Sequence, residues 1–121
     1  MGNKKVNRDL ALKILEVVGA VKDALDDLLD TMFIIYQPKD HVGAVGETAS
    51  FTVVAMNVTS YQWEVYRSGT WQNTYGTGYN TDTIIYEITN TTRNFKWRCK
   101  LTDSDGNIIY TDVVEIIIET T

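Results

Sequence analysis

The stretch Phe95-Lys96-Trp97-Arg98-Cys99-Lys100-Leu101 alternates large apolar residues with basic ones, and it decides the fold of most of the chain. Successive side chains of a β-strand point to opposite faces of a sheet. An alternation of this kind therefore predicts a strand with one buried face and one face in solvent. A helix would bring its apolar residues back every three or four positions, which this stretch does not do.

The same period of two recurs along the chain from residue 33 onward. Apolar residues take every second position over 51–55, 61–65 and 84–88. Turn-forming residues separate these segments, and residues 104–107 (Ser-Asp-Gly-Asn) predict a tight hairpin that leads into one final strand over 108–118. About seven short strands with this spacing predict an all-β sandwich.

Several short motifs follow one another in an informative order: Gln37-Pro38, Val45-Gly46-Glu47-Thr48-Ala49-Ser50-Phe51, Tyr61-Gln62-Trp63, Trp97-Arg98-Cys99 and Thr102-Asp103. This order resembles an immunoglobulin-like domain, closest in character to those of bacterial and phage surface proteins. The resemblance implies a structural core of Val53, Trp63, Trp97 and Cys99. Val53 stands where the family places the second cysteine, so the resemblance implies a sandwich without the inter-sheet disulfide.

The first 32 residues follow a helical period. Apolar residues spaced three and four apart predict a long amphipathic helix over 7–32, capped by Asn7, in front of a sandwich domain over 33–121. Its candidate oligomerisation residues are Leu10, Ile14, Val17, Val21, Leu25 and Leu28.

Two uses of this helix remain open. Copies associate in a parallel bundle, such as a trimeric coiled coil, or the helix docks on its own sandwich at Val54, Met56 and Ile117. We favour the homo-oligomer, because both inner faces of a small sandwich are already used by its core.

The segment Asn7-Arg8-Asp9-Leu10-Ala11-Leu12-Lys13-Ile14-Leu15-Glu16-Val17 resembles the leading helix of tailed-phage head fibre and virion decoration proteins. The resemblance implies a non-enzymatic structural or attachment protein on the virion surface. Such a protein is made in the bacterial cytoplasm without a signal peptide, contacts capsid or tail proteins, and binds host surface glycans weakly. The alternative is a carbohydrate-binding or adhesion module of a bacterial cell-surface protein.

Composition excludes several classes of function. The 121 residues suit one domain with an appendage, and the net charge of -5 argues against a nucleic-acid partner. One Cys and one His exclude an internal disulfide and the usual zinc sites. No apolar run approaches the ~20 residues that membrane insertion requires, and the charged N-terminal pattern is typical of a helix and not of a signal peptide.

Catalytic residues, metals and cofactors are not expected. His41 is predicted to lie in a loop, and Cys99 is predicted to be an inert core thiol. The stretch Asp103-Ser104-Asp105-Gly106-Asn107 has alternating oxygen ligands, but a calcium loop would also need a Glu at position 114, which is Val. A hairpin turn is the favoured interpretation.

The candidate ligand-binding residues are aromatic. Tyr66, Trp71, Tyr75 and Tyr79 lie among glycines, asparagines and a glutamine, a composition that can stack on sugar rings. In the alternative interpretation, Trp71 covers the edge of the sandwich core.

The basic residues Lys96, Arg98 and Lys100 predict a stripe along one strand face. Such a stripe meets an acidic polymer or pairs across strands with Glu64 and Glu115. Because the chain is acidic overall, the pairing is favoured.

Overall fold

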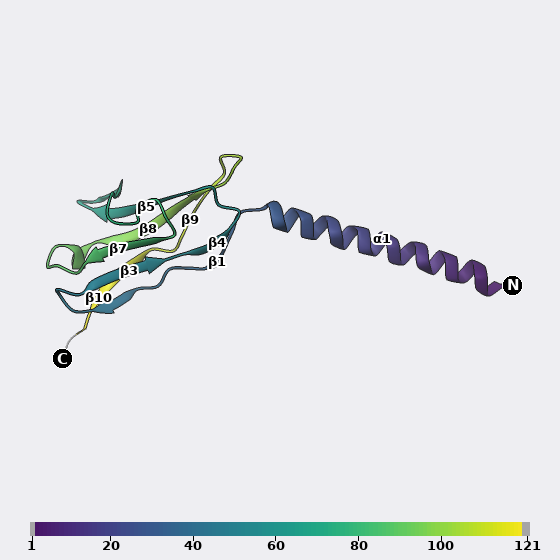
Figure 1. Ribbon diagram of the computed structural model, residues 1–121, viewed down its shortest axis with the longest axis horizontal. Helices are drawn as coiled ribbons and strands as arrows, with labels where there is room; N and C mark the ends of the chain where they lie inside the picture. Colours follow the sequence, from purple (N-terminus) through teal and green to yellow (C-terminus); the bar gives the residue numbers. More distant parts are fainter. Residues whose placement is uncertain (1, 120–121) are drawn as a thin grey trace. The chain divides into compact units, whose positions relative to one another are not determined.

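The structure is a computed structural model that describes the backbone of residues 2–119 and the side chains of residues 10–23 and 30–119. The chain divides into two compact units, Met1–Thr31 and Met32–Thr121. The first unit contains the helix α1 (Gly2–Asp30), and the second contains the strands (Figure 1).

The elements of the second unit follow the predicted strands closely. They are β1 (Phe33–Tyr36), β2 (His41–Gly43), β3 (Thr48–Thr52), β4 (Val54–Met56), β5 (Ser60–Arg67), β6 (Thr70–Asn73), β7 (Thr83–Glu87), the 3-10 turn η1 (Thr92–Asn94), β8 (Lys96–Thr102), β9 (Ile108–Tyr110) and β10 (Val114–Ile118).

Two layers of strands face each other as a sandwich. One sheet has the order β2-β10-β8-β5-β6, and β9 also pairs with β8. The other layer contains the antiparallel pairs β1-β4 and β3-β7, and only Val53 separates β3 from β4. The pair β2-β10 is parallel, whereas the other pairs are antiparallel. The predicted class, mainly β with one N-terminal helix, is confirmed.

The core lies between the two layers. The largest fully buried side chains are Trp63, Trp97, Phe51, Ile84, Ile88, Leu101, Val53 and Cys99. Trp97, Cys99 and Leu101 occupy alternate positions on β8, so a period of two in the sequence becomes a buried face in the structure. Each fully buried side chain of this size contributes about 1.5–3 kcal/mol through the hydrophobic effect.

The final strand differs from the prediction, because it splits into β9 and β10. Thr111 is buried, and its Oγ1 accepts a hydrogen bond from the Cys99 backbone N–H at 2.8 Å. The next backbone N–H, that of Asp112, donates to the Gln37 side-chain oxygen at 2.8 Å. These two side chains take part in the hydrogen bonding where the regular ladder ends, beside the bond from the Thr111 N–H to the Cys99 carbonyl at 2.9 Å. A single unbroken strand over 108–118 was the wrong prediction.

Two local predictions were also wrong. His41 begins β2 and is not in a loop. The reason is that β2 pairs with β10 in the larger sheet, where His41 lies opposite Ile116. The helix begins at Gly2, so Asn7 lies inside the helix and is not its cap. The residues 3–6 include no proline or glycine that would delay the start of the helix.

Candidate binding surface

One face of the larger sheet points away from the core and carries the predicted basic stripe. Because Trp63, Trp97 and Cys99 point inward, their strand neighbours point outward. The pairing register then places Trp71, Tyr66 and Lys96 in one row, Glu64 beside Arg98, and Lys100 beside Tyr110. We call this surface the outer face. Its residues are Gln62, Glu64, Tyr66, Trp71, Asn73, Lys96, Arg98, Lys100, Ile108, Tyr110 and Glu115.

Arg98 occupies the middle of the outer face, between two aromatic rings. Its guanidinium carbon lies 4.3 Å from the centroid of the Trp71 ring and 4.2 Å from the centroid of the Tyr110 ring. A cation over an aromatic face is attracted by the ring quadrupole, by about 0.5–1 kcal/mol at an exposed site. The planar guanidinium also stacks on rings better than an ammonium does.

Glu64 holds the same arginine from the side. The Nε of Arg98 donates to Oε1 of Glu64 at 2.8 Å, and the two side chains are only 25% and 12% exposed. The favoured cross-strand pairing with Glu64 is thus confirmed. Glu115 is the register partner of Lys96, but among the side chains that the structure describes the Arg98–Glu64 contact is the one ion pair.

Trp71 lies on the outer face, with Tyr66 as its neighbour. The two ring centroids are 5.3 Å apart at an angle of 59°. Trp71 is half-buried and is not one of the residues that pack against the core. The interpretation that it covers the core edge is therefore wrong, and the reason is its register opposite Tyr66, on the solvent side of β5.

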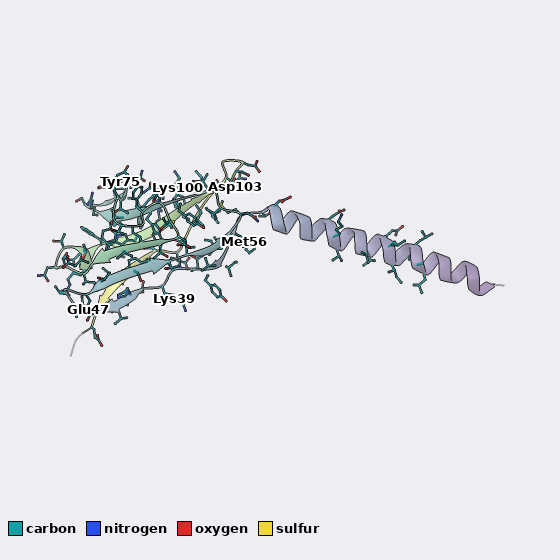
Figure 2. All side chains as sticks on the ribbon, viewed as in Figure 1. Lys39, Glu47, Met56, Tyr75, Lys100 and Asp103 are labelled. Carbon is teal, nitrogen blue, oxygen red and sulfur yellow. The ribbon has the colours of Figure 1, made fainter. Side chains whose placement is uncertain are left out.

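The other two aromatic candidates form a separate pair in the segment after β6. Tyr75 and Tyr79 meet edge to face, with their centroids 5.2 Å apart. Tyr79 packs against the core, and its carbonyl accepts a hydrogen bond from the Trp63 backbone N–H at 2.8 Å. Tyr75 is 73% exposed, and Figure 2 shows it on the same upper side of the sandwich as Lys100. No ring contact joins the two pairs within residues 30–119.

Tyr110 was missed by the sequence reasoning. It alternates with Ile109, which packs against the core, and it faces Lys100 across β8 and β9. The sequence could have placed Tyr110 opposite Lys100, because the hairpin over 104–107 sets the register of the strands on either side. The stacking of Arg98 on its ring was not readable, because it depends on side-chain rotamers.

The helical candidates for oligomerisation are exposed where the structure describes them. Leu10, Ile14, Val17 and Val21 are 58%, 54%, 62% and 53% exposed. Lys13, Ile14, Val17 and Val18 line a shallow apolar hollow on α1. Leu25 and Leu28 lie outside the residues whose side chains are described.

Nucleophilic chemistry has little support in the described residues. Cys99 is fully buried, and burial raises the pKa of its thiol to about 12. A reactive cysteine needs the opposite, a lowered pKa and access to solvent. His41 accepts a hydrogen bond at Nδ1 from the Ser50 backbone N–H at 3.4 Å.

Asp103 uses its carboxylate to close a turn. Its Oδ1 accepts hydrogen bonds from the backbone N–H groups of Asp105 and Asn107, both at 2.9 Å, and its Oδ2 accepts from the Asn107 amide at 3.0 Å. Gly106 has a φ of 85°, as a tight hairpin requires. The hairpin interpretation is confirmed. Among the side chains of residues 10–23 and 30–119, no cluster of three His, Cys, Asp or Glu is suited to a metal.

In the part of the chain that the structure describes, α1 is not apolar enough over a sufficient length to cross a bilayer.

No protein-family model and no curated protein matches the sequence. Among solved structures, the chain is similar to D1 of Duf (Kirre), with a TM-score of 0.52 and 14% identity over 75% of this chain and 99% of that chain. It is also similar to the titin M10–obscurin-like 1 Ig complex, with a TM-score of 0.51 and 10% identity over 73% of this chain and 93% of that chain.

A third similar structure is the N-terminal Ig1-2 module of the Drosophila receptor protein tyrosine phosphatase DLAR. It has a TM-score of 0.51 and 15% identity, over 73% of this chain and 48% of that chain. At such identities the likeness concerns the fold alone, and it does not support the phage or bacterial character implied by the sequence. The unit Met32–Thr121 has an immunoglobulin-like fold.

Proposed function

We propose that the chain is a non-enzymatic structural and attachment protein of the virion surface, of the head-fibre or decoration type. In this proposal α1 joins copies into a homo-oligomer, and each copy displays one immunoglobulin-like sandwich. The observation that carries the proposal is the solvent exposure of Leu10, Ile14, Val17 and Val21 on one helix. A trimer fits the pattern.

The spacing of these residues supports association between copies. Ile14 and Val21 are seven residues apart, and so are Leu10 and Val17, which gives the two seam positions of a coiled coil. Most of the stability of a protein helix comes from packing of its apolar face, because an isolated helix is marginal in water. A helix of 29 residues with this face is therefore stabilised strongly by a neighbouring copy.

Thermal unfolding followed at the helical circular-dichroism band tests the association. The melting temperature of an oligomer rises with protein concentration, whereas that of a monomer does not. We expect a concentration-dependent helix transition in the wild type. The double variant Ile14→Ser/Val21→Ser loses it, and the control Lys22→Ser/Asp23→Ser, which changes exposed charged positions of α1 away from the seam, keeps it.

The alternative use of the helix gives a different result. If α1 docks on Val54, Met56 and Ile117 of its own sandwich, the transition is independent of concentration, and Ile14→Ser/Val21→Ser also lowers the melting temperature of the sandwich. That result would overturn the oligomeric part of the proposal.

The location on a virion is tested by immunogold electron microscopy of a lysate from the source organism. Gold label on the capsid or tail of virus particles would support the proposal and would show which of the two structures the protein contacts. Label on cell walls instead supports the second candidate, a carbohydrate-binding or adhesion module of a bacterial cell-surface protein. The 73% exposed ring of Tyr75 favours that candidate, because exposed aromatic side chains offer an apolar face to sugar rings.

A further inference from the structure

We propose that the outer face binds an acidic polysaccharide, and that Arg98 receives the carboxylate or phosphate groups of that polymer. This inference rests on the attachment function proposed above and names the chemistry of its ligand. It starts from the position of Arg98, which the structure holds in place on three sides.

The guanidinium is oriented before any ligand arrives. The guanidinium carbon of Arg98 lies over the rings of Trp71 and Tyr110, at 4.3 and 4.2 Å from their centroids. Glu64 accepts the hydrogen bond of the Arg98 Nε at 2.8 Å. In the described part of the chain, its terminal nitrogens make no further hydrogen bond. These nitrogens form the fork that binds carboxylate and phosphate in a bidentate manner. An arginine that is already ordered loses little side-chain entropy on binding.

Two ammonium groups extend the site along β8. Lys96 and Lys100 lie two residues before and after Arg98, about 7 Å away along the strand on the same face. Neither forms an ion pair with a described side chain. Figure 2 shows Lys100 at the upper side of the sandwich, where β8 runs.

The charge balance of this surface favours an anionic polymer of modest charge density. The acidic register partners of Lys96, Arg98 and Lys100 are Glu64 and Glu115, so these three cations outnumber the carboxylates paired with them in a chain of net charge -5. A nucleic acid would need many more phosphate contacts to bind well. A polysaccharide with single carboxylate or phosphate groups along its chain needs only a few such contacts.

The remaining groups of the outer face suit sugars better than a protein partner. Tyr110 and Tyr66 are 45% and 38% exposed, so both offer ring surface to a sugar, and exposed Asn73 offers amide hydrogen bonds. Trp71 is already covered by Arg98 and Tyr66. It therefore does not protrude as the aromatic anchor that fills a pocket in a protein interface.

Isothermal titration of the full chain at low ionic strength tests the proposal. The probes are polygalacturonate for carboxylate, poly(glycerol phosphate) for phosphate, dextran as a neutral polysaccharide and polyglutamate as an acidic peptide. We expect binding to at least one of the two anionic polymers, polygalacturonate or poly(glycerol phosphate), and no binding to dextran. The stronger of the two anionic probes identifies the group. Equal binding to polyglutamate, or no binding to either anionic probe, would overturn the proposal.

Variants locate the site. Arg98→Ala weakens binding about tenfold or more, and Arg98→Lys, which keeps the charge but loses the planar fork, also weakens it. Lys100→Gln weakens binding severalfold, whereas Lys13→Gln on α1 removes the same charge without effect. If Arg98→Ala does not fold, the comparison of Lys100→Gln with Lys13→Gln decides. Equal affinity in these two variants would contradict the site.

Failure of this inference differs from failure of the proposed function. Light scattering on the titrated sample gives the oligomeric state independently. A monomer that binds polygalacturonate would support the outer-face site and contradict the oligomeric display. An oligomer that binds neither anionic polymer would contradict the outer-face site and support the oligomeric display.

Discussion

Trp63 on β5 lies directly opposite Cys99 on β8, and neither side chain has any solvent exposure. The Trp63 indole N–H donates to the Thr81 carbonyl at 2.8 Å, so its one polar atom is satisfied. Val53 is buried equally well in the facing layer. The sandwich is therefore closed by packing of these side chains, with a free thiol in place of a disulfide.

The buried thiol predicts slow chemical labelling of Cys99. Its pKa is raised to about 12, so the folded protein holds the neutral, unreactive form at about pH 8. We expect a disulfide-exchange reagent to label the native protein only as fast as it unfolds, and to label one thiol per chain at once in denaturant. Rapid labelling of the native protein would contradict the burial of Cys99.

The same shift predicts a pH dependence of stability. Because the pKa is raised from 9.0, the contribution of the neutral thiol is fully present below pH 9.0 and is lost as the pH rises toward about 12. The denaturant midpoint should therefore fall more steeply above pH 9.0 in the wild type than in Cys99→Ala. Parallel curves would show that the thiol does not titrate in this way.

Gly78 is predicted to tolerate no side chain. Its φ is 84°, and a Cβ there would overlap with the Thr83 carbonyl oxygen. Gly69 has a similar φ of 80° but open space around the Cβ position, so it serves as the control. Gly69→Ala should cost about 1 kcal/mol of unfolding free energy, and Gly78→Ala should cost clearly more. Equal costs in urea unfolding would contradict the packing of this turn.

Gly19 is predicted to be a weak point of α1. A Cβ at this position meets no atom within 4 Å, and glycine inside a helix costs about 0.5–1 kcal/mol relative to alanine. Gly19→Ala should therefore raise the melting temperature of the helical band without changing the oligomeric state. A lower melting temperature would mean that another chain approaches the helix closely at Gly19.

The turn closed by Asp103 is predicted to weaken in acid. The hydrogen bond from the Asn107 side chain, with those from backbone N–H groups, lowers the pKa of Asp103 below its usual 3.8. Stability from this carboxylate is present above that usual pKa and is lost as the pH falls through the lowered value. Carboxyl carbon chemical shifts in NMR should titrate below pH 3.8, and Asp103→Asn should keep the turn without this acid transition. A titration at or above the usual value would contradict the hydrogen-bond pattern.

The strands of the sandwich were predictable because their burial follows the alternation of residue types. Trp97, Cys99 and Leu101 are inward and Arg98 is outward, as a period of two requires. The cross-strand pairing of Arg98 with Glu64 was predictable for a similar reason, since the two strands are antiparallel and carry opposite charges.

Other features depend on contacts between distant segments and were not predictable from local pattern. The break between β9 and β10 depends on hydrogen bonds from the Cys99 backbone N–H to Thr111 Oγ1 and from the Asp112 backbone N–H to the Gln37 side-chain oxygen. The contact between Arg98 and the Tyr110 ring depends on the register of β8 and β9, which the hairpin between them sets. The four aromatic candidates separate into two pairs, because Trp71 lies on a strand and Tyr75 lies in the segment after it.

The molar mass of the full chain in solution shows whether α1 joins copies. Sedimentation equilibrium over a range of concentrations should give a multiple of the 13.7 kDa chain, three chains in the arrangement that we favour. The variant Ile14→Ser/Val21→Ser should sediment as a single folded chain. A wild-type mass of one chain at every concentration would contradict the account of α1 as the element that joins copies and displays the sandwich.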